Sequence, residues 1–338
     1  MNRTEKRKKK SKWRKLKYGS LIALASMTIA IGSGFTYEAI ASNQGARDYP
    51  PPGKLVDAGG YELHLVKSGG GSPAIVLESG SGETSLSWRD IPNDLATYAT
   101  VVTYDRAGYA WSEMASSERT GDNIVRELYT ALKKEGIQGP YLMVGHSLGG
   151  MYARLFAQTY RDEVMGLVLV DARPEDDAQD TKAILEEEKF AGNPPASTLK
   201  LLKQSGILRL LQNNLLKGLV AEEDSGQFIN IIATPSYFKA KEEEAKFAYS
   251  TEDAIRGQRL GSLPVRIIAR GVPQDYTQAG ISVAGGRKLE KIWQSGQQKM
   301  LDISTDSHLI VAEKSGHMVI HDQPELVVDT ILGLLPWR

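Results

Sequence analysis

The chain has 338 residues, a length that allows one large domain or two smaller ones. Its 41 basic and 41 acidic residues balance, so the total charge gives no sign of a nucleic-acid partner. The absence of cysteine excludes disulfides, thiolate metal sites and a thiol nucleophile.

The N-terminal part departs from this even charge balance. Residues 1–17 contain ten Lys or Arg and a single acid, whereas residues 18–37 carry no charge. An apolar segment of about 20 residues can span a bilayer, and basic residues on one flank keep that end in the cytoplasm. We therefore predict a basic cytoplasmic tail (1–17) and a single-pass transmembrane anchor at 18–41, with the folded domain outside the cell. A cleaved secretory signal is the alternative, because Ala39–Ala41 has small residues at the spacing of a signal-peptidase site, and the protein would then be secreted.

A spacer and a domain with alternating strands and helices are predicted next. Residues 42–53 are polar and contain three consecutive prolines, which is typical of a semi-rigid spacer. Short β-rich runs with glycine pairs then predict an opening hairpin. Four later runs are continuously apolar, as in parallel strands covered on both faces: 100–105, 141–146, 166–171 and 264–271. Helical patterns separate them, so we predict a mostly parallel, doubly wound α/β sheet in a domain covering residues 54–338.

The alternation of strands and helices stops between about residues 174 and 262. Amphipathic helical patterns fill this region, and we predict a helical cap inserted into the domain. The acid-rich runs at 186–188 and 242–244 are expected to be solvated helix faces. The histidines are scattered, so we expect neither a metal nor another cofactor.

The sequence GHSLGG at residues 145–150 places Ser147 between a predicted strand and a predicted helix. This context is that of a nucleophile elbow, in which a sharp turn exposes the serine hydroxyl. Gly145 and Gly149 allow the strand and the helix to approach this turn without a Cβ clash. We predict that Ser147 is a catalytic nucleophile.

A serine nucleophile needs a histidine base, and the chain has five histidines. His317 follows the last predicted strand and precedes the last helix, the place where a fold with serine before histidine carries its base. It is our candidate, with His321 as a weaker alternative that more simply anchors the loop. We expect the side chain of His146 to point away from the nucleophile turn. His64 and His308 are interpreted as strand residues.

Two aspartates could orient the imidazole of that base. Asp171 ends the strand after the nucleophile helix, and Asp275 follows the next strand in the sequence ARGVPQDY. Either carboxylate could accept a hydrogen bond from the histidine and stabilise its cation. We favour Asp171 and keep Asp275 as the alternative acid.

The oxyanion of an acyl-transfer reaction needs backbone donors. The residue after the nucleophile, Leu148, supplies one N–H, and the loop after an early strand supplies another. In the sequence VLESGSGET this second donor is most simply Ser81, because the glycines on either side permit a tight turn. Glu78, at the end of that strand, is interpreted as a structural partner of Arg106 or of a nearby N–H.

From Gly53 to Leu335 the chain resembles the α/β-hydrolase family. The resemblance is carried by GHSLGG, by YDRAGYAWS (104–112), by GLVLVDARPED and by SGHMVIHDQPELV, in the order serine, acid, histidine. Two features differ from the family pattern. The frequent His-Gly of the oxyanion loop is Ser79-Gly80, and the usual Gly-x-x-Asp is GVPQD, with Asp275 one residue late.

The resemblance implies a serine hydrolase that cleaves a small carboxylic ester, acyl or lipid-like, through an acyl-enzyme. An amidase, a peptidase or an acyltransferase would use the same triad, and a non-catalytic binding protein could retain it. Dehalogenases and epoxide hydrolases of this family carry aspartate where this chain has Ser147, which argues against both.

Overall fold

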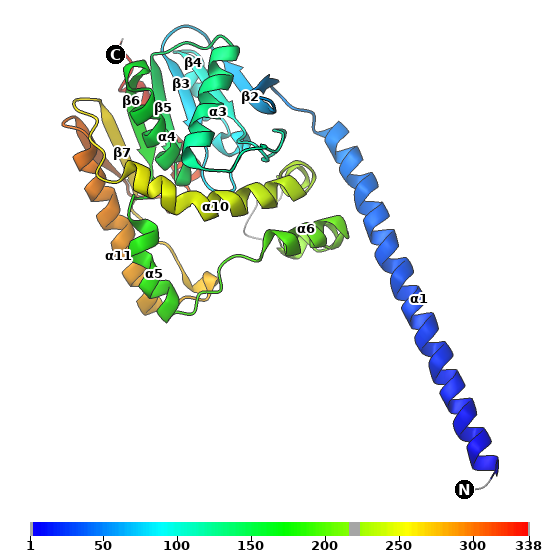
Figure 1. Ribbon diagram of the computed structural model, residues 1–338. Coiled ribbons are helices and arrows are strands. Elements are labelled where there is room, and N and C mark those ends of the chain that lie inside the picture. The colour runs from blue at the N-terminus through cyan, green and yellow to red at the C-terminus, as the bar shows by residue number, and fades with distance from the viewer. Residues whose placement is uncertain (1–2, 216–223, 337–338) are drawn as a thin grey trace. The chain divides into compact units, whose positions relative to one another are not determined.

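The computed structural model describes residues 3–215 and 224–336 (Figure 1). Residues 216–223, inside the predicted cap, and the extreme ends of the chain lie outside the described residues. The chain divides into two compact units. One comprises Met1–Pro50 with Ala196–Pro235, and the other comprises Pro51–Pro195 with Ser236–Arg338.

The second unit is built on a sheet of eight described strands in the order β1-β2-β4-β3-β5-β6-β7-β8. These are β1 (Lys54–Asp57), β2 (Glu62–Ser68), β3 (Ala74–Glu78), β4 (Thr100–Tyr104), β5 (Tyr141–His146), β6 (Val164–Val170), β7 (Val265–Arg270) and β8 (Ser307–Ala312). Only the pairings of β1 with β2 and of β2 with β4 are antiparallel. The predicted mostly parallel sheet with an opening hairpin is therefore confirmed.

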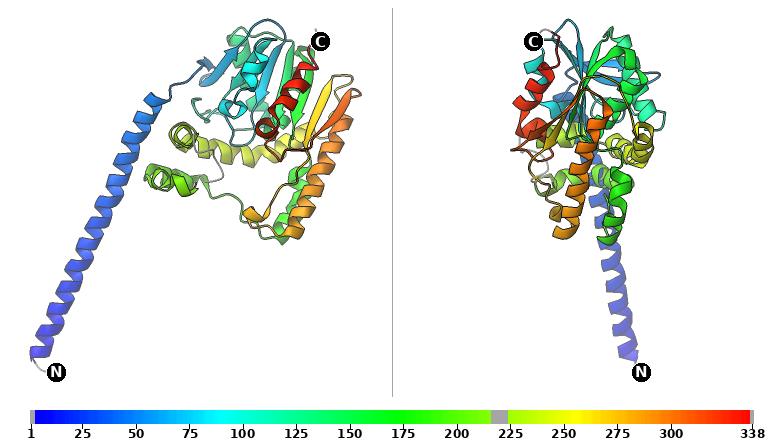
Figure 2. Two further views of the ribbon diagram at one scale, coloured as in Figure 1. Left: turned by 180° about the vertical axis from the view of Figure 1, so that it is seen from behind. Right: turned by 90° about the vertical axis from the view of Figure 1, so that its left-hand side faces the viewer.

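Helices cover both faces of this sheet (Figure 2, right). The helices of the second unit are α2 (Ile91–Leu95), α3 (Gly121–Lys134), α4 (Leu148–Thr159), α5 (Asp177–Glu187), α10 (Pro235–Ile255), α11 (Val283–Lys299), α12 (Val319–Asp322) and α13 (Pro324–Leu332), with short 3₁₀ turns at Ser85–Trp88, Arg161–Glu163, Thr277–Ala279 and Met300–Ile303. Side chains from α3 and α4 pack with Val76 and Met143 on one face, whereas those from α2, α12 and α13 pack with Leu77 and Val144 on the other. Successive residues of each strand thus enter opposite cores, as the period of a pleated strand requires.

Most of the described part of the predicted cap region is helical, and its helices belong to both units. Besides α5 and α10 it contains α6 (Ala196–Gln204), α7 (Ile207–Leu210), α8 (Gln212–Leu215), α9 (Ser225–Gln227) and a π-helical turn at Phe228–Ile232. In Figure 1, α5 lies beside α11 in the second unit.

The expectation of a solvated face at residues 242–244 is wrong for Glu244 on α10. Its side chain is fully buried and accepts hydrogen bonds from Arg106 Nε (2.9 Å) and from Tyr109 Oη (2.8 Å). Arg106 also donates to Glu78 Oε1 at 2.8 Å, as the sequence suggested. Burial raises the pKa of Glu78 to about 7, and the positive charge of Arg106 offsets this effect only in part. The buried ion cluster thus ties α10 to the end of β3.

We expect Glu244→Gln to lower the free energy of unfolding by about 3 kcal/mol, because it removes one charge from a buried ion pair. Glu243→Gln is the matched control, since its partner Lys239 is exposed and such a surface pair contributes less than about 1 kcal/mol. Urea unfolding followed by circular dichroism measures both variants. Equal losses in the two variants would contradict the role assigned to the buried cluster.

In the first unit, α1 runs from Arg3 to Asp48. The predicted anchor boundary at residue 41 is therefore not a helix end, and most of the predicted spacer is helical. The part Trp13–Asp48 is long and apolar enough to cross a membrane by length and composition, a test that a signal sequence near the N-terminus also passes.

Candidate active site

Ser147 occupies a strained turn between the last residue of β5, His146, and the first residue of α4, Leu148. Its φ of 51° and ψ of −121° lie outside the regions that non-glycine residues favour. The turn leaves no space beside it: a Cβ on Gly145 would lie 2.5 Å from the carbonyl oxygen of Gly149. The glycines flanking the serine therefore allow the strand and the helix to meet, as the sequence pattern predicts.

His317 brings the base to this serine from the loop between β8 and α12. Its Nε2 lies 3.0 Å from Ser147 Oγ, and its Nδ1 lies 2.6 Å from Asp171 Oδ2. Because a carboxylate only accepts, Nδ1 carries the proton and Nε2 accepts from the serine hydroxyl. The three predicted residues thus form one continuous hydrogen-bonded chain.

Asp171 is held in place by several donors besides His317. It follows β6 with a φ of 38° and is fully buried. Its carboxylate accepts from Arg270 Nη1 at 2.9 Å and from Trp293 Nε1 at 2.9 Å. Burial alone would raise the pKa of Asp171, but the hydrogen bond from His317 and the charge of Arg270 outweigh it, so the pKa lies below its usual value. The carboxylate is therefore ionised at neutral pH.

The alternative acid, Asp275, lies elsewhere. Its carboxylate is solvent-exposed and accepts hydrogen bonds from the backbone N–H (2.9 Å) and the hydroxyl (2.6 Å) of Thr277. It thereby binds the first residue of the short turn at Thr277–Ala279. The structure brings Asp171, and not Asp275, to the imidazole.

The predicted oxyanion donors lie on the two segments that enclose Ser147. Leu148 opens α4, and the first N–H groups of a helix have no acceptor within that helix. Ser81 follows β3 in a loop whose shape is fixed by a hydrogen bond from the N–H of Gly80 to Glu83 Oε2 (2.8 Å). This loop contacts the elbow, because a Cβ on Gly149 would lie 2.5 Å from the carbonyl oxygen of Ser79.

His146 and Glu83 form a support for the site that the sequence pattern did not reveal. His146 is fully buried, with Nδ1 2.9 Å from Glu83 Oε2 and Nε2 2.9 Å from the carbonyl oxygen of His317. Both partners only accept, so both ring nitrogens donate and the imidazole is a cation. Burial would lower the pKa of His146, but the charge of Glu83 and its hydrogen bond raise it. The oxyanion loop and the loop of His317 are thus joined through one ion pair.

The remaining histidines have structural contacts. His321 Nε2 donates to the carbonyl oxygen of Ser87 (2.8 Å), in agreement with the loop-anchoring role expected for it. His64 in β2 pairs with Asp105 at 2.7 Å in the core. His308 lies in β8, as expected. Among the described residues no group of three or more His, Asp or Glu has metal-binding geometry.

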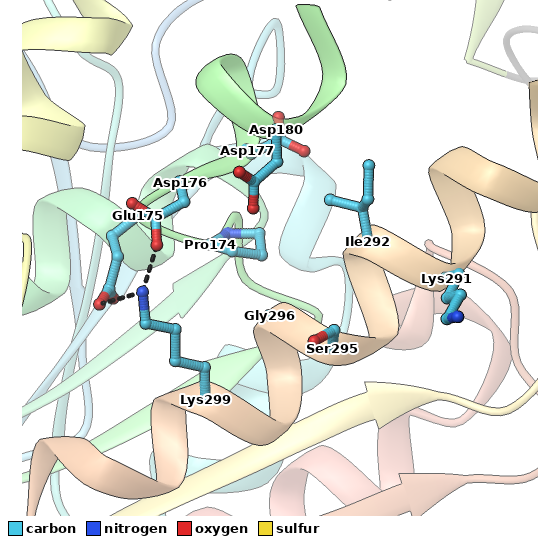
Figure 3. A pocket seen from close by; sticks show the side chains of 10 residues that line it. All are labelled: Pro174, Glu175, Asp176, Asp177, Asp180, Lys291, Ile292, Ser295, Gly296 and Lys299. Atoms are coloured by element: carbon cyan, nitrogen blue, oxygen red, sulfur yellow. Dashed lines mark hydrogen bonds and ion pairs between the residues drawn. The ribbon is translucent and has the colours of Figure 1, made fainter. Parts of the chain in front are cut away.

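A cavity of about 270 Å³ is lined in part by residues that follow Asp171 closely in the sequence, but none of the triad residues lines it (Figure 3). It is lined by residues 174–177 and Asp180 on one side and by residues of α11, including Lys299, on the other. Two of its four acidic side chains, those of Glu175 and Asp176, form ion pairs with Lys299, as the dashed lines in Figure 3 show. We therefore assign no substrate to this cavity.

Comparisons with known proteins agree with the observed fold. Residues 73–200 match a family model described as the alpha/beta hydrolase fold. An uncharacterized Bacillus subtilis protein, YqjL, is 27% identical over 77% of this chain and 83% of its own length. A soluble epoxide hydrolase of Corynebacterium sp. is 25% identical over 81% of this chain and 93% of its own. The solved structure of a thermophilic esterase from Thermogutta terrifontis superposes with a TM-score of 0.56 at 21% identity, covering 81% of this chain and 92% of the esterase.

Proposed function

Since this chain has the α/β-hydrolase fold, we propose that it is a serine hydrolase that cleaves carboxylic esters through an acyl-enzyme. The observation that carries the proposal is the hydrogen-bonded chain from Ser147 through His317 to the ionised Asp171. A serine hydroxyl becomes an effective nucleophile when a base within hydrogen-bond reach takes its proton.

The geometry supports a two-step mechanism. His317 Nε2 takes the proton of Ser147 as Oγ attacks the ester carbonyl carbon, and the resulting imidazolium is stabilised by Asp171. The N–H groups of Leu148 and Ser81 stabilise the oxyanion of the tetrahedral intermediate. His317 then protonates the leaving alcohol, which leaves an acyl group on Ser147. Water, deprotonated by the same histidine, attacks the acyl carbon and releases the acid.

Epoxide hydrolysis is the second candidate, because one relative is a soluble epoxide hydrolase. In the epoxide hydrolases of this fold the nucleophile is an aspartate, and this chain has Ser147 in that place. A serine that opened an epoxide would form an ether, which the base and water of this site could not hydrolyse in the way that they hydrolyse an ester. An amidase or acyltransferase reaction would use the same residues as the esterase.

We expect the purified protein to hydrolyse p-nitrophenyl esters and to leave styrene oxide unchanged, because only the ester yields a hydrolysable acyl-enzyme. A series of p-nitrophenyl esters of rising acyl length, read at the absorbance of p-nitrophenol, gives the acyl preference. Fluorophosphonate labelling identifies the acylated residue by mass spectrometry of the Ser147 peptide. Turnover of the epoxide with no ester turnover would reject the proposal, and failure of both reactions and of labelling would favour a binding protein.

We further propose that α1 is retained as a membrane anchor, with the basic tail in the cytoplasm and the hydrolase unit outside. The 20 uncharged residues 18–37 and the ten basic residues before them support this orientation. A fluorophore attached to a Met27→Cys variant in lipid vesicles should then be quenched by nitroxide-labelled lipids.

A further inference from the structure

The first unit joins α1 to the short helices that follow residue 196. The turn between α6 and α7 packs directly on α1 at Gly34. A Cβ at that position would lie 2.5 Å from the carbonyl oxygen of Ser205, so only glycine permits this approach. The α6–α7 turn is therefore fixed at one level along α1.

A buried ion cluster holds the same contact one helical turn later. Glu38 of α1 is buried, and its carboxylate accepts from Lys203 Nζ (2.5 Å) and from Arg209 Nε (2.8 Å). Lys203 also donates to the carbonyl oxygen of Ile229 (2.6 Å). Charge-assisted hydrogen bonds of this kind are about twice as strong as neutral ones. They bind both α6 and α7 to α1.

The level of this contact coincides with the end of the apolar segment. The uncharged residues 18–37 extend for about 30 Å at 1.5 Å per residue, which is the thickness of the hydrocarbon core. Gly34 lies three residues, or about 4.5 Å, before the end of that segment. When α1 spans a bilayer, the α6–α7 turn consequently lies at the boundary between acyl chains and headgroups.

At this level α7 presents an apolar face to solvent. Ile207, Leu210 and Leu211 are spaced i, i+3 and i+4, so their side chains share one side of the helix. They are 39%, 73% and 45% exposed, whereas Arg209 between them is turned toward Glu38. Large apolar side chains gathered in this way mark a surface that binds an apolar partner.

We propose that Ile207, Leu210 and Leu211 form a membrane seat, which rests in the headgroup and acyl boundary of the leaflet on the hydrolase side. Lipid is the occupant because this face begins beside the exposed end of the apolar segment of α1: a Cβ on Gly206, the residue before Ile207, would lie 3.7 Å from Cδ1 of Tyr37, and Tyr37 is half exposed. The proposal goes beyond the ester chemistry and rests on the proposed retention of α1. Cleavage after Ala41 would remove Glu38 and leave Lys203 buried without its carboxylate.

The experiment uses the absence of native cysteine in the chain. Full-length Leu210→Cys and Leu211→Cys variants, each carrying an environment-sensitive fluorophore, are reconstituted into vesicles of phosphatidylcholine and phosphatidylglycerol. Val272→Cys is the matched control, because Val272 is also 45% exposed but belongs to the second unit. Met27→Cys lies at the middle of the apolar segment, about 15 Å from the headgroups, and reports the anchor through a lipid with its nitroxide at the end of the acyl chain. A lipid with a nitroxide near the headgroup should quench positions 210 and 211 at least about threefold more than position 272, since interfacial helices lie about 5–10 Å deep.

Quenching at positions 27, 210 and 211 distinguishes failure of the proposed lipid contact from failure of the proposed anchor. If position 27 is quenched and positions 210 and 211 are quenched no more than position 272, the proposed membrane seat is wrong and the proposed anchor is still supported. No quenching at 27, 210 or 211 would overturn both proposals. Blue-shifted emission at 210 without lipid quenching would show that a protein surface, such as a second copy of the chain, covers this face, and would also overturn the seat.

Discussion

Ser147→Ala should lower kcat/KM for p-nitrophenyl esters by at least about ten-thousand-fold and abolish fluorophosphonate labelling. The expectation follows from the geometry at Ser147 Oγ, which lies 3.0 Å from His317 Nε2. Without the hydroxyl no acyl-enzyme can form, and only the residual rate from substrate binding and oxyanion donors remains. Initial rates over a range of substrate concentrations, together with gel fluorescence of the labelled protein, measure the two effects.

A matched serine variant distinguishes loss of the nucleophile from general damage. Ser116→Ala changes an exposed serine of the loop after β4 and should keep both turnover and labelling within about twofold of the wild type, as surface substitutions do. Thermal unfolding should be nearly the same for the two variants. Label that persists in Ser147→Ala would mean that another residue is acylated, and the assignment of the nucleophile would be lost.

Most of the sheet could be predicted because its strands are buried on both faces. The apolar run at 141–146 coincides with β5, and the run at 264–271 contains β7 with one residue left over at each end. The signal here is local, since a continuous apolar run bounded by glycine or proline fixes a parallel strand without knowledge of its neighbours. The doubly wound α/β class was predictable for the same reason, whereas the α/β-hydrolase fold was implied by the motifs that resemble that family.

Contacts between distant residues could not be predicted in this way. Glu244 is 138 residues from its partner Arg106, and Glu38 is 165 residues from Lys203. Glu244 belongs to an acidic run that looks solvated when only its own helix is considered, and Glu38 lies within the predicted membrane segment. The contact between Arg270 and Asp171 was easier to predict. Arg270 ends the strand next to β6, and parallel strands place their carboxyl ends at one edge of the sheet.

Asp171→Asn should lower kcat about a thousand- to ten-thousand-fold, whereas Asp275→Asn should stay within about twofold of the wild type. The carboxylate of Asp171 faces only donors: His317 Nδ1, Arg270 Nη1 and Trp293 Nε1. An asparagine amide would turn an N–H toward at least one of them. If it faces His317, the ring must carry its proton on Nε2, where it can no longer accept the proton of Ser147.

The comparison of the two aspartates decides which acid completes the triad. Asp275 only accepts hydrogen bonds from Thr277, so its amide variant alters a surface contact and leaves the imidazole untouched. Kinetics on a p-nitrophenyl ester give kcat and KM separately, and thermal unfolding shows that both variants are folded. We expect the loss in Asp171→Asn to fall on kcat with KM little changed, because the carboxylate acts on the base and does not touch the substrate. Small and equal losses in both variants would reject the triad, and a larger loss in Asp275→Asn would transfer the role of the acid to that residue.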